Sequence, residues 1–312
     1  MSVIQGILLG ILQGVAEFLP ISSSGHLLVA QKLFGLEEVP LLFDIFLHMA
    51  TLLAVVIYFR KKIWNLLKIL GRWIARKPRP ENTENPDDLL CGTDVAGRRT
   101  IIAIIITTAI TGVLGYFMSK KIDGASIKLT CAGFLITAFL LILSSVAANK
   151  KRIPGKSGFF ARFSKKETEP ATENSEIFEN NENQKKLPAG ISILQSVIIG
   201  IMQGFGTLPG ISRSGSTIAG ALYSGVDKSA AGDYSFLVSI PAILGAFVLE
   251  LKDLGQVKES VGVAAVIAGC AAAFATGYIA LTLLMKILRK GKLHWFAAYL
   301  IPLGIFGLFF FR

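Results

Sequence analysis

The sequence predicts an all-α integral membrane protein made of two inverted-topology repeats, with six transmembrane helices and two re-entrant helical hairpins. Three observations lead to this fold class. The composition is apolar, since 52% of the residues are hydrophobic and 17% are charged, whereas soluble domains carry about 25% charged residues. Six segments have the apolar character of membrane spans, which need about 20 residues. One short motif also occurs twice.

The six predicted spans are long apolar segments. They lie at 42–59, 100–119, 128–148, 234–251, 261–285 and 293–311. Two further apolar stretches, 3–19 and 191–208, are each followed by a proline and a Ser/Gly cluster. A helix broken inside a membrane is tolerated only where the break is buried in protein or lines a wet cavity. We therefore interpret these stretches as re-entrant hairpins, whose second helices lie near 24–34 and 214–226.

The repeated motif relates residues 10–25, GILQGVAEFLPISSSG, to residues 200–215, GIMQGFGTLPGISRSG, with 8 of 16 positions identical. Each half contains one hairpin and three spans. Because an odd number of crossings inverts the second half, binding sites are expected near the midplane at the broken helices. The predicted units are a first repeat at 1–149, a polar cytoplasmic linker at 150–187 and a second repeat at 188–312. The first repeat includes an amphipathic and polar cytoplasmic loop at 61–98.

The distribution of basic residues predicts the orientation. Loops 60–99, 149–188 and 286–292 carry 10, 9 and 4 Lys or Arg, 23 in total, whereas the opposite side carries 7. The positive-inside rule makes the richer side cytoplasmic, so both termini are expected outside and the hairpins enter from opposite sides. The net charge of +11 does not indicate nucleic acid, because the basic residues flank apolar spans.

Three cysteines, Cys91, Cys131 and Cys270, lack CxxC spacing, so neither a disulfide framework nor a zinc site is predicted. Glycines at a spacing of four, Gly6, Gly10 and Gly14, form a ridge that allows helices to approach closely in lipid. Such ridges would also allow a homodimer if they were exposed.

The first motif carries the candidate acid. Gln13 and Glu17 are four residues apart, so they share one helix face. An ionisable group inside a membrane costs at least about 2.5–3.5 kcal/mol and is usually functional. Glu17 therefore indicates either a ligand for a divalent metal or a general base, and the absence of a second carboxylate argues against a two-metal site. His48, one turn after Asp44, is ambiguous between a structural and a functional role.

Polar residues follow at the start of the second helix of this hairpin: Ser22, Ser23, Ser24 and His26. Serines cap helix N-termini, and a helix N-terminus also binds phosphate through its free N–H groups and dipole. His26 could be a hydrogen-bonded core residue, transfer a proton or attack phosphorus.

The second motif places Arg213 in a Ser/Gly loop, with Ser212, Ser214 and Thr217 around it. The planar guanidinium binds phosphate in bidentate fashion, and the hydroxyl groups would complete an anion site. A structural ion pair between Arg213 and Glu17 is the alternative. The two motifs together predict a site for an anionic phosphate headgroup whose lipid lies in the bilayer.

With these motifs the chain resembles the undecaprenyl-diphosphate phosphatase family of the bacitracin-resistance type. The resemblance rests on QGVAEFLPISSSGHL, FDIFLHMATLLAVVIYF, PGISRSGSTI and AGDYSFLVSIPAILGA. It implies a multi-pass enzyme of the bacterial cytoplasmic (inner) membrane with an outward-facing active site and divalent-metal dependence. It also implies that the substrate is a polyprenyl diphosphate, hydrolysed to recycle the carrier of cell-wall synthesis.

The resemblance assigns roles to residues of both motifs. The family's (E/Q)xxxE pair falls on Gln13 and Glu17, its serine and histidine on Ser23 and His26, and its phosphate-binding arginine on Arg213. Glu17 is expected to hold Mg²⁺ or Ca²⁺ or to activate the attacking group. Either Ser23 is the nucleophile with His26 as its proton partner, or His26 attacks or activates water with Ser23 as a phosphate ligand. The remaining predicted substrate-binding residues are Gln13, Ser22, Ser24, Ser212, Ser214 and Thr217.

A second function class stays open at this point. Inverted repeats with broken helices are typical of transporters, so the protein could instead move a polyprenyl phosphate across the membrane. Release of phosphate from a lipid diphosphate would distinguish the enzyme from such a flippase.

Overall fold

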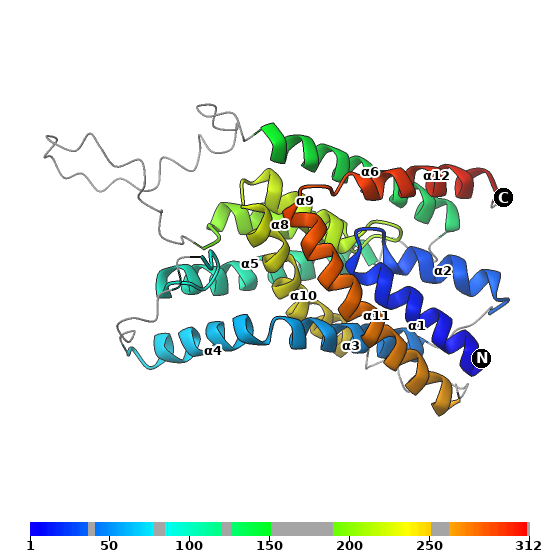
Figure 1. Ribbon diagram of the computed structural model, residues 1–312, viewed down its shortest axis with the longest axis horizontal. Coiled ribbons are helices and arrows are strands. Elements are labelled where there is room, and N and C mark those ends of the chain that lie inside the picture. The colour runs from blue at the N-terminus through cyan, green and yellow to red at the C-terminus, as the bar shows by residue number, and fades with distance from the viewer. Residues whose placement is uncertain are drawn as a thin grey trace, which may run out of the picture.

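A computed structural model describes residues 1–36, 41–77, 85, 87–119, 126–150, 190–250 and 262–310 (Figure 1). In these ranges every regular element is a helix. In chain order the helices are α1 (Val3–Phe18), α2 (Ser23–Leu33), α3 (Leu41–Tyr58), α4 (Arg60–Ile74), α5 (Asp94–Ser119), α6 (Ile127–Lys150), α8 (Ile193–Phe205), α9 (Arg213–Tyr223), α10 (Lys228–Glu250), α11 (Val263–Arg289) and α12 (Trp295–Phe310). The predicted all-helical class is confirmed for these residues.

Four of the helices are long and apolar enough to cross a membrane by themselves, namely α5, α6, α10 and α11. Helix α3 passes the same test only together with α4, from which it is bent by 75°, and counting this pair as one span gives five. Helix α12 has 16 described residues, fewer than the about 20 that a full span needs. The structure thus supports a membrane protein with four or five candidate spans, and the sixth span stays a prediction.

Both motif segments are broken where prolines and serines were expected to break them. Helix α1 ends at Phe18 and α2 begins at Ser23, and α8 ends at Phe205 before α9 begins at Arg213. Ser2 and Ser192 begin α1 and α8 with the same capping box, in which each serine hydroxyl accepts from the backbone N–H of a glutamine three residues later. The two motif helices therefore have the same local construction.

Each motif helix packs against a helix from the other half of the sequence. Helix α1 packs along α11, and α8, which holds the equivalent place in the repeat, packs along α5. Gly10 allows the first approach, because a Cβ at this position would meet the backbone of Gly269. A Cβ on Gly204 would likewise meet Leu114 of α5. The predicted glycine ridges thus lie inside the protein, where they position the two motif helices.

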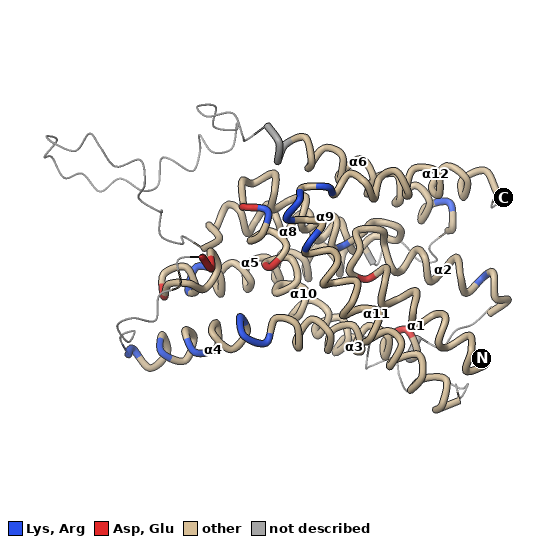
Figure 2. Tube along the Cα trace, in the orientation of Figure 1, with Lys and Arg blue, Asp and Glu red and all other residues tan. Residues whose placement is uncertain are grey.

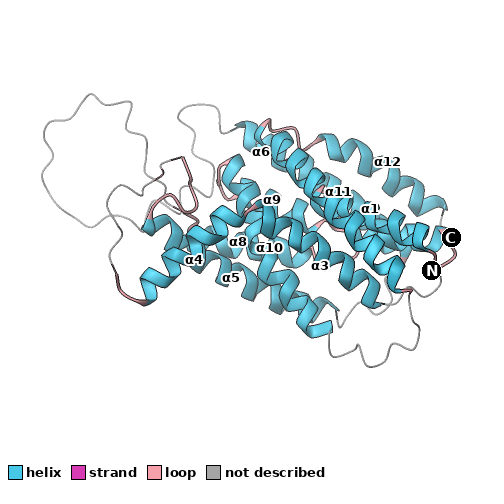
Figure 3. Ribbon diagram, turned by 60° about the horizontal axis from the view of Figure 1, so that its bottom comes forward, coloured by secondary structure: helices cyan, strands magenta, loops and turns pink. Residues whose placement is uncertain are grey.

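The core lies between these helices and α3, α9 and α10, and its fully buried side chains include Phe18, Ile218 and Tyr234. Helices α6 and α12 lie side by side. The start of α1 and the end of α12 lie at the same end of the molecule in both views (Figures 1 and 3).

Helix α4 is the basic amphipathic element expected in loop 61–98, and Lys and Arg recur along it (Figure 2). Its Lys62 Nζ lies 2.8 Å from Asp88 Oδ2 and 2.9 Å from Asp233 Oδ2 at the start of α10. Burial alone would raise the pKa of Asp88, but the hydrogen bond and the charge of Lys62 outweigh it and lower that pKa. Burial, together with Asp88, raises the pKa of the Cys91 thiol to about 12. This cluster ties α4 to α10.

The predicted linker at 150–187 lies outside the described residues, apart from the backbone of Lys150 at the end of α6. The division of the chain at 149 and 188 therefore stays a prediction.

Candidate functional site

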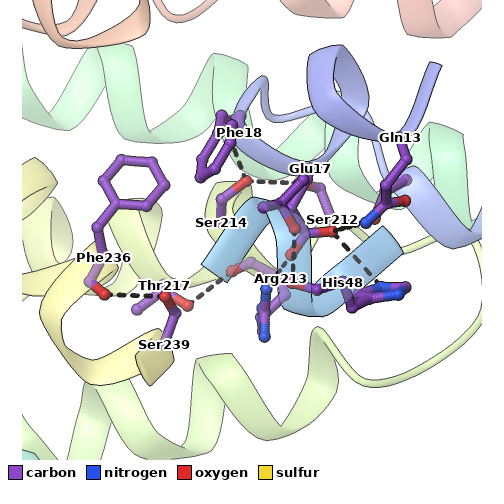
Figure 4. A network of polar contacts seen from close by, with 12 residues as sticks. Gln13, Glu17, Phe18, His48, Ser212, Arg213, Ser214, Thr217, Phe236 and Ser239 are labelled. Atoms are coloured by element: carbon purple, nitrogen blue, oxygen red, sulfur yellow. Dashed lines mark hydrogen bonds and ion pairs between the residues drawn. The ribbon is translucent and has the colours of Figure 1, made fainter. Parts of the chain in front are cut away.

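Glu17 and Arg213 form the centre of the site. Glu17 lies in the last turn of α1 and is 7% exposed, and Arg213 is the first residue of α9. An Arg213 guanidinium nitrogen donates to Glu17 Oε1 in an ion pair (Figure 4). The fully buried Gln13 donates from Nε2 to Glu17 Oε2 at 3.1 Å. The predicted i,i+4 pair on α1 therefore faces the arginine of the second motif.

Ser23 is the third group on this carboxylate. Its hydroxyl donates to Glu17 Oε2 at 2.6 Å. The preceding residue, Ser22, has a φ of 72°, in the left-handed region that a non-glycine residue adopts at a cost of about 1–3 kcal/mol. The strained turn before α2 thus presents Ser23 to Glu17.

His48 of α3 also approaches the carboxylate, with Nε2 3.6 Å from Glu17 Oε2. Its Nδ1 donates to the carbonyl oxygen of Asp44 at 2.8 Å, which orients Nε2 toward the site (Figure 4). The sequence left His48 ambiguous, and its position one turn after Asp44 in an apolar segment is the signal that pointed to it.

The second motif is held by hydroxyl groups. Ser212 Oγ accepts from the Gly215 N–H at 3.1 Å and caps α9, whereas Ser22, at the equivalent place before α2, makes no side-chain cap. Ser214 Oγ donates to the carbonyl oxygen of Phe18 at 3.3 Å, and so joins the α9 start to the end of α1. Thr217 Oγ1 donates to the carbonyl oxygen of Arg213 at 2.6 Å and lies 3.3 Å from Gln203 Oε1. These contacts fix the loop that carries the arginine.

A narrow cavity opens beside the ion pair. It is lined by four predicted site residues, Glu17, Arg213, Ser214 and Thr217. The other lining residues are Phe18, Thr51, Val55, Gln203, Ser235, Phe236, Ser239 and Ile243. Gln203 is the repeat counterpart of Gln13, so the repeat was the sequence signal that could have found it. The α10 residues have no counterpart in the repeated motif, but they lie in AGDYSFLVSIPAILGA, one of the segments on which the family resemblance rests.

Six predicted residues do not line this cavity: Gln13, Ser22, Ser23, Ser24, His26 and Ser212. Ser24 is on the exposed face of α2, and Ser22 is buried without capping α2 through its side chain. His26 donates from Nδ1 to the carbonyl oxygen of Ser22 at 2.8 Å, and its Nε2 lies 2.8 Å from the hydroxyl of Tyr299, on which its ring stacks. The structure therefore brings Gln13, Glu17, Ser23 and Arg213 together and turns His26 toward α12.

The available oxygen atoms suit a divalent cation only in part. No group of three or more His, Cys, Asp or Glu that could hold a metal occurs in the described part of the chain. Gln13 Oε1 is buried and has no hydrogen-bond partner among the described residues, so it could join a carboxylate oxygen of Glu17. Mg²⁺ is commonly held by one or two carboxylates together with substrate phosphates and water. The residues fit a cation that binds together with a phosphate ligand.

Fold and site together define an apolar helical protein with a buried acid, a hydroxyl group and a guanidinium at one cavity, a set suited to an anionic group. The sequence model of the family described as Bacitracin resistance protein BacA matches residues 6–306. The chain belongs to this family.

Three relatives of the chain share a name. It is similar to a protein of Treponema denticola named undecaprenyl-diphosphatase, with 41% identity over 98% of this chain and 96% of the relative. Two more proteins with that name, from Desulfosudis oleivorans and Carboxydothermus hydrogenoformans, are each 36% identical. They match 97% and 98% of this chain and cover 97% and 96% of their own lengths.

Proposed function

We propose that this protein hydrolyses undecaprenyl diphosphate to undecaprenyl phosphate and inorganic phosphate, and so recycles the lipid carrier of cell-wall synthesis. Family membership and the names of the relatives support this activity. The observation that carries it is the meeting of Arg213 and Ser23 on the carboxylate of Glu17, beside the cavity that Glu17 and Arg213 line. A cation for phosphate, an acceptor for a proton and a hydroxyl nucleophile are the parts that phosphoryl transfer needs.

Arg213 is the phosphate-binding residue in this proposal. The terminal phosphoryl group displaces Glu17 as the partner of the guanidinium, and the transferring oxygens then receive its N–H groups. Positively charged donors that are fixed before the reaction stabilise the charge that spreads over these oxygens. The same displacement releases the carboxylate for a different role.

Ser23 is the nucleophile. Its hydroxyl already donates to Glu17 at 2.6 Å, so Glu17 accepts this proton while Oγ attacks the terminal phosphorus. The bond to the bridging oxygen breaks and the lipid monophosphate leaves. Water then attacks the phosphoserine, Ser23 recovers its proton, and inorganic phosphate is released.

His26 stays a candidate for the attacking or proton-transferring group. Its Nδ1 and Nε2 are engaged by Ser22 and Tyr299, which favours Ser23 with Glu17 over the route through His26. The variants that separate the two routes are given in the Discussion.

We also propose that a divalent cation, Mg²⁺ or Ca²⁺, binds with the substrate. The unpartnered Gln13 Oε1 and the substrate phosphates would hold it, with Glu17 as a ligand only while its carboxylate is unprotonated. A cation at this point neutralises phosphate charge and orients the diphosphate.

The proposed setting is the bacterial cytoplasmic membrane, with the site open to the exterior and both termini outside. Inverted repeats with six spans and two re-entrant hairpins are supported by the exchanged packing of α1 on α11 and α8 on α5. The orientation is supported by Lys and Arg along α4 and at the end of α11, away from the end where both termini lie (Figure 2). The proposal allows for a homodimer, which the molecular mass of the purified protein in detergent would test.

The direct test is phosphate release from undecaprenyl diphosphate by the purified protein in detergent with Mg²⁺. We expect stoichiometric formation of undecaprenyl phosphate and inorganic phosphate. Reorientation of the lipid in vesicles without phosphate release would contradict the enzyme and favour the flippase, for which the relatives described above offer no support.

A further inference from the structure

One wall of the cavity belongs to neither copy of the repeated motif. Helix α10 contributes Ser235, Phe236, Ser239 and Ile243 to the lining that also contains Glu17 and Arg213. In Figure 4 Phe236 and Ser239 lie on one side of the site, beside Thr217, and Glu17 and Arg213 lie together on the other. The cavity lining thus reaches from the ion pair to α10.

Ser235 is the unusual residue of this wall. Its side chain is 2% exposed and its hydroxyl has no hydrogen-bond partner in the described part of the chain. A serine in a helix commonly donates to a carbonyl oxygen of the preceding turn, and Ser239 does so with Phe236 O at 2.8 Å. A buried hydroxyl that makes no such bond is costly, and it is available to a ligand in the cavity.

The residues before Ser235 fix its direction. Asp233 pairs with Lys62 of α4 at 2.9 Å, and the hydroxyl of Tyr234 lies 2.8 Å from Thr107 Oγ1 of α5. Because these two contacts hold α10 against two other helices, the helix cannot rotate without breaking them. Ser235 is therefore kept toward the cavity by contacts on other faces of α10.

The surroundings of Ser235 specify which group it would bind. The cavity that Ser235 lines is apolar at Phe236 and Ile243 of α10 and at Val55 of α3, and Ser239, one turn after Ser235, has its hydroxyl bonded to Phe236 O. The inner phosphate of a lipid diphosphate is bonded to the first carbon of the lipid chain, whereas the terminal phosphate bears no carbon. A hydroxyl next to apolar side chains suits the inner phosphate.

We propose that Ser235 binds the inner phosphate of the diphosphate, the one that remains on the lipid, while Arg213 binds the terminal phosphate. This inference rests on the proposed function and deepens it. It assigns a second phosphate subsite that distinguishes a diphosphate headgroup from a single phosphate.

The test compares two inhibitors that contain no lipid. Inorganic phosphate fills one subsite, whereas methylenediphosphonate, which cannot be hydrolysed, spans both. With purified protein and farnesyl diphosphate as substrate, Ser235→Ala should weaken inhibition by methylenediphosphonate about tenfold, as expected for one hydrogen bond to a charged group. Inhibition by inorganic phosphate should change less than about twofold, and KM should rise about tenfold with kcat nearly unchanged.

Ser145→Ala is the matched control, because Ser145 of α6 is also buried with an unpartnered hydroxyl and lies outside the cavity lining. It should leave both inhibition constants unchanged. Since the removed hydroxyl of Ser235 makes no bond in the protein, Ser235→Ala should melt no lower than the wild type. If it does melt lower, Ser235→Cys, which keeps the shape with a weaker donor, should show the same selective loss.

The outcomes separate this inference from the proposed function. A wild-type protein that releases no phosphate contradicts the phosphatase itself. A wild-type phosphatase whose Ser235→Ala variant keeps its inhibition by methylenediphosphonate overturns only the second subsite. Equal weakening of both inhibitors also overturns it, because Ser235 would then act on the Arg213 subsite or on the whole cavity.

Discussion

Arg213 and Ser23 occupy equivalent positions in the two copies of the motif, and both bind the same carboxylate. Arg213 donates to Glu17 Oε1, and Ser23 donates to Glu17 Oε2 at 2.6 Å. The second helices of the two copies thus begin at equivalent residues, Ser23 and Arg213, but place different groups on Glu17. Thr207, which stands where a second Glu17 would be, leaves the site with one acid. Divergence between the copies therefore produces a single site with unlike groups.

Arg213→Lys tests whether the planar fork of the arginine is needed. We expect kcat/KM to fall about 10²–10³-fold, because lysine keeps the charge but cannot donate in bidentate fashion to a transferring phosphoryl group. Steady-state phosphate release with farnesyl diphosphate measures the change. Activity within threefold of the wild type would show that a point charge is sufficient.

A second pair of variants measures how much the ion pair between Arg213 and Glu17 contributes to stability. Arg213→Ala leaves the buried Glu17 without its cation and should lower stability by about 2 kcal/mol, since the guanidinium is partly exposed. Adding Glu17→Gln should restore the melting temperature in detergent without restoring activity. Recovery of activity in the double variant would contradict both assigned roles.

Ser23→Ala should abolish the covalent intermediate. We expect kcat to fall at least about 10³-fold, as for loss of a nucleophile. Quenching of the wild type in SDS at neutral pH, which preserves both phosphoserine and phosphohistidine, with a substrate labelled in its terminal phosphate should trap labelled protein, and the variant should yield none. Label that survives in Ser23→Ala but disappears in His26→Ala would establish His26 as the attacking group. Tyr299→Phe, which removes only the hydroxyl next to His26 Nε2, is the matched control.

Removal of divalent cations should stop the reaction. Activity should disappear in EDTA and return with Mg²⁺ or Ca²⁺. Gln13→Ala removes the unpartnered Oε1 and should raise the Mg²⁺ concentration for half-maximal activity about tenfold, a typical effect of losing one contact at a metal site. Unchanged activity in excess EDTA would rule out the cation in the proposed function.

Gly10→Ala should destabilise the packing of α1 on α11. Its new Cβ would meet the backbone of Gly269, and forcing helices apart in this way costs about 1–3 kcal/mol. Gly112→Ala in α5 is the control, because nothing lies within 4 Å of its added Cβ. Melting of the two variants in detergent gives the comparison, and equal melting temperatures would show that α1 and α11 do not approach closely at Gly10.

Lys62→Met should lower stability at neutral pH and lose this effect in acid. The variant leaves Asp88 and Asp233 without their shared cation, at a cost of about 2 kcal/mol for charged hydrogen bonds that are partly exposed. The pKa of Asp88 is lowered in the folded protein, so its pairing stabilises fully above the ordinary Asp pKa of about 3.9, and this stabilisation is lost as pH falls from there through the lower pKa of the folded protein. Melting temperatures at pH 7 and pH 3 measure the difference, which should shrink at the lower pH.

Much of this protein followed from its sequence. Apolar segments long enough to cross a bilayer predicted an all-helical membrane protein, since a helix makes all its backbone hydrogen bonds within the segment and so is stable in lipid. The repeated motif pointed to Glu17, Ser23 and Arg213 because buried ionisable groups in an apolar protein are costly unless they are used. The glycines at a spacing of four indicated close helix contacts, and Gly10 makes one.

Tertiary packing decided the rest. The orientation of His26 toward Tyr299, the approach of His48 to Glu17 and the presence of Ser235 in the cavity all depend on which helix lies against which. Local sequence sets where a helix begins and which face a residue occupies. It does not set which distant helix meets that face, because this depends on the shape of every packed side chain between them.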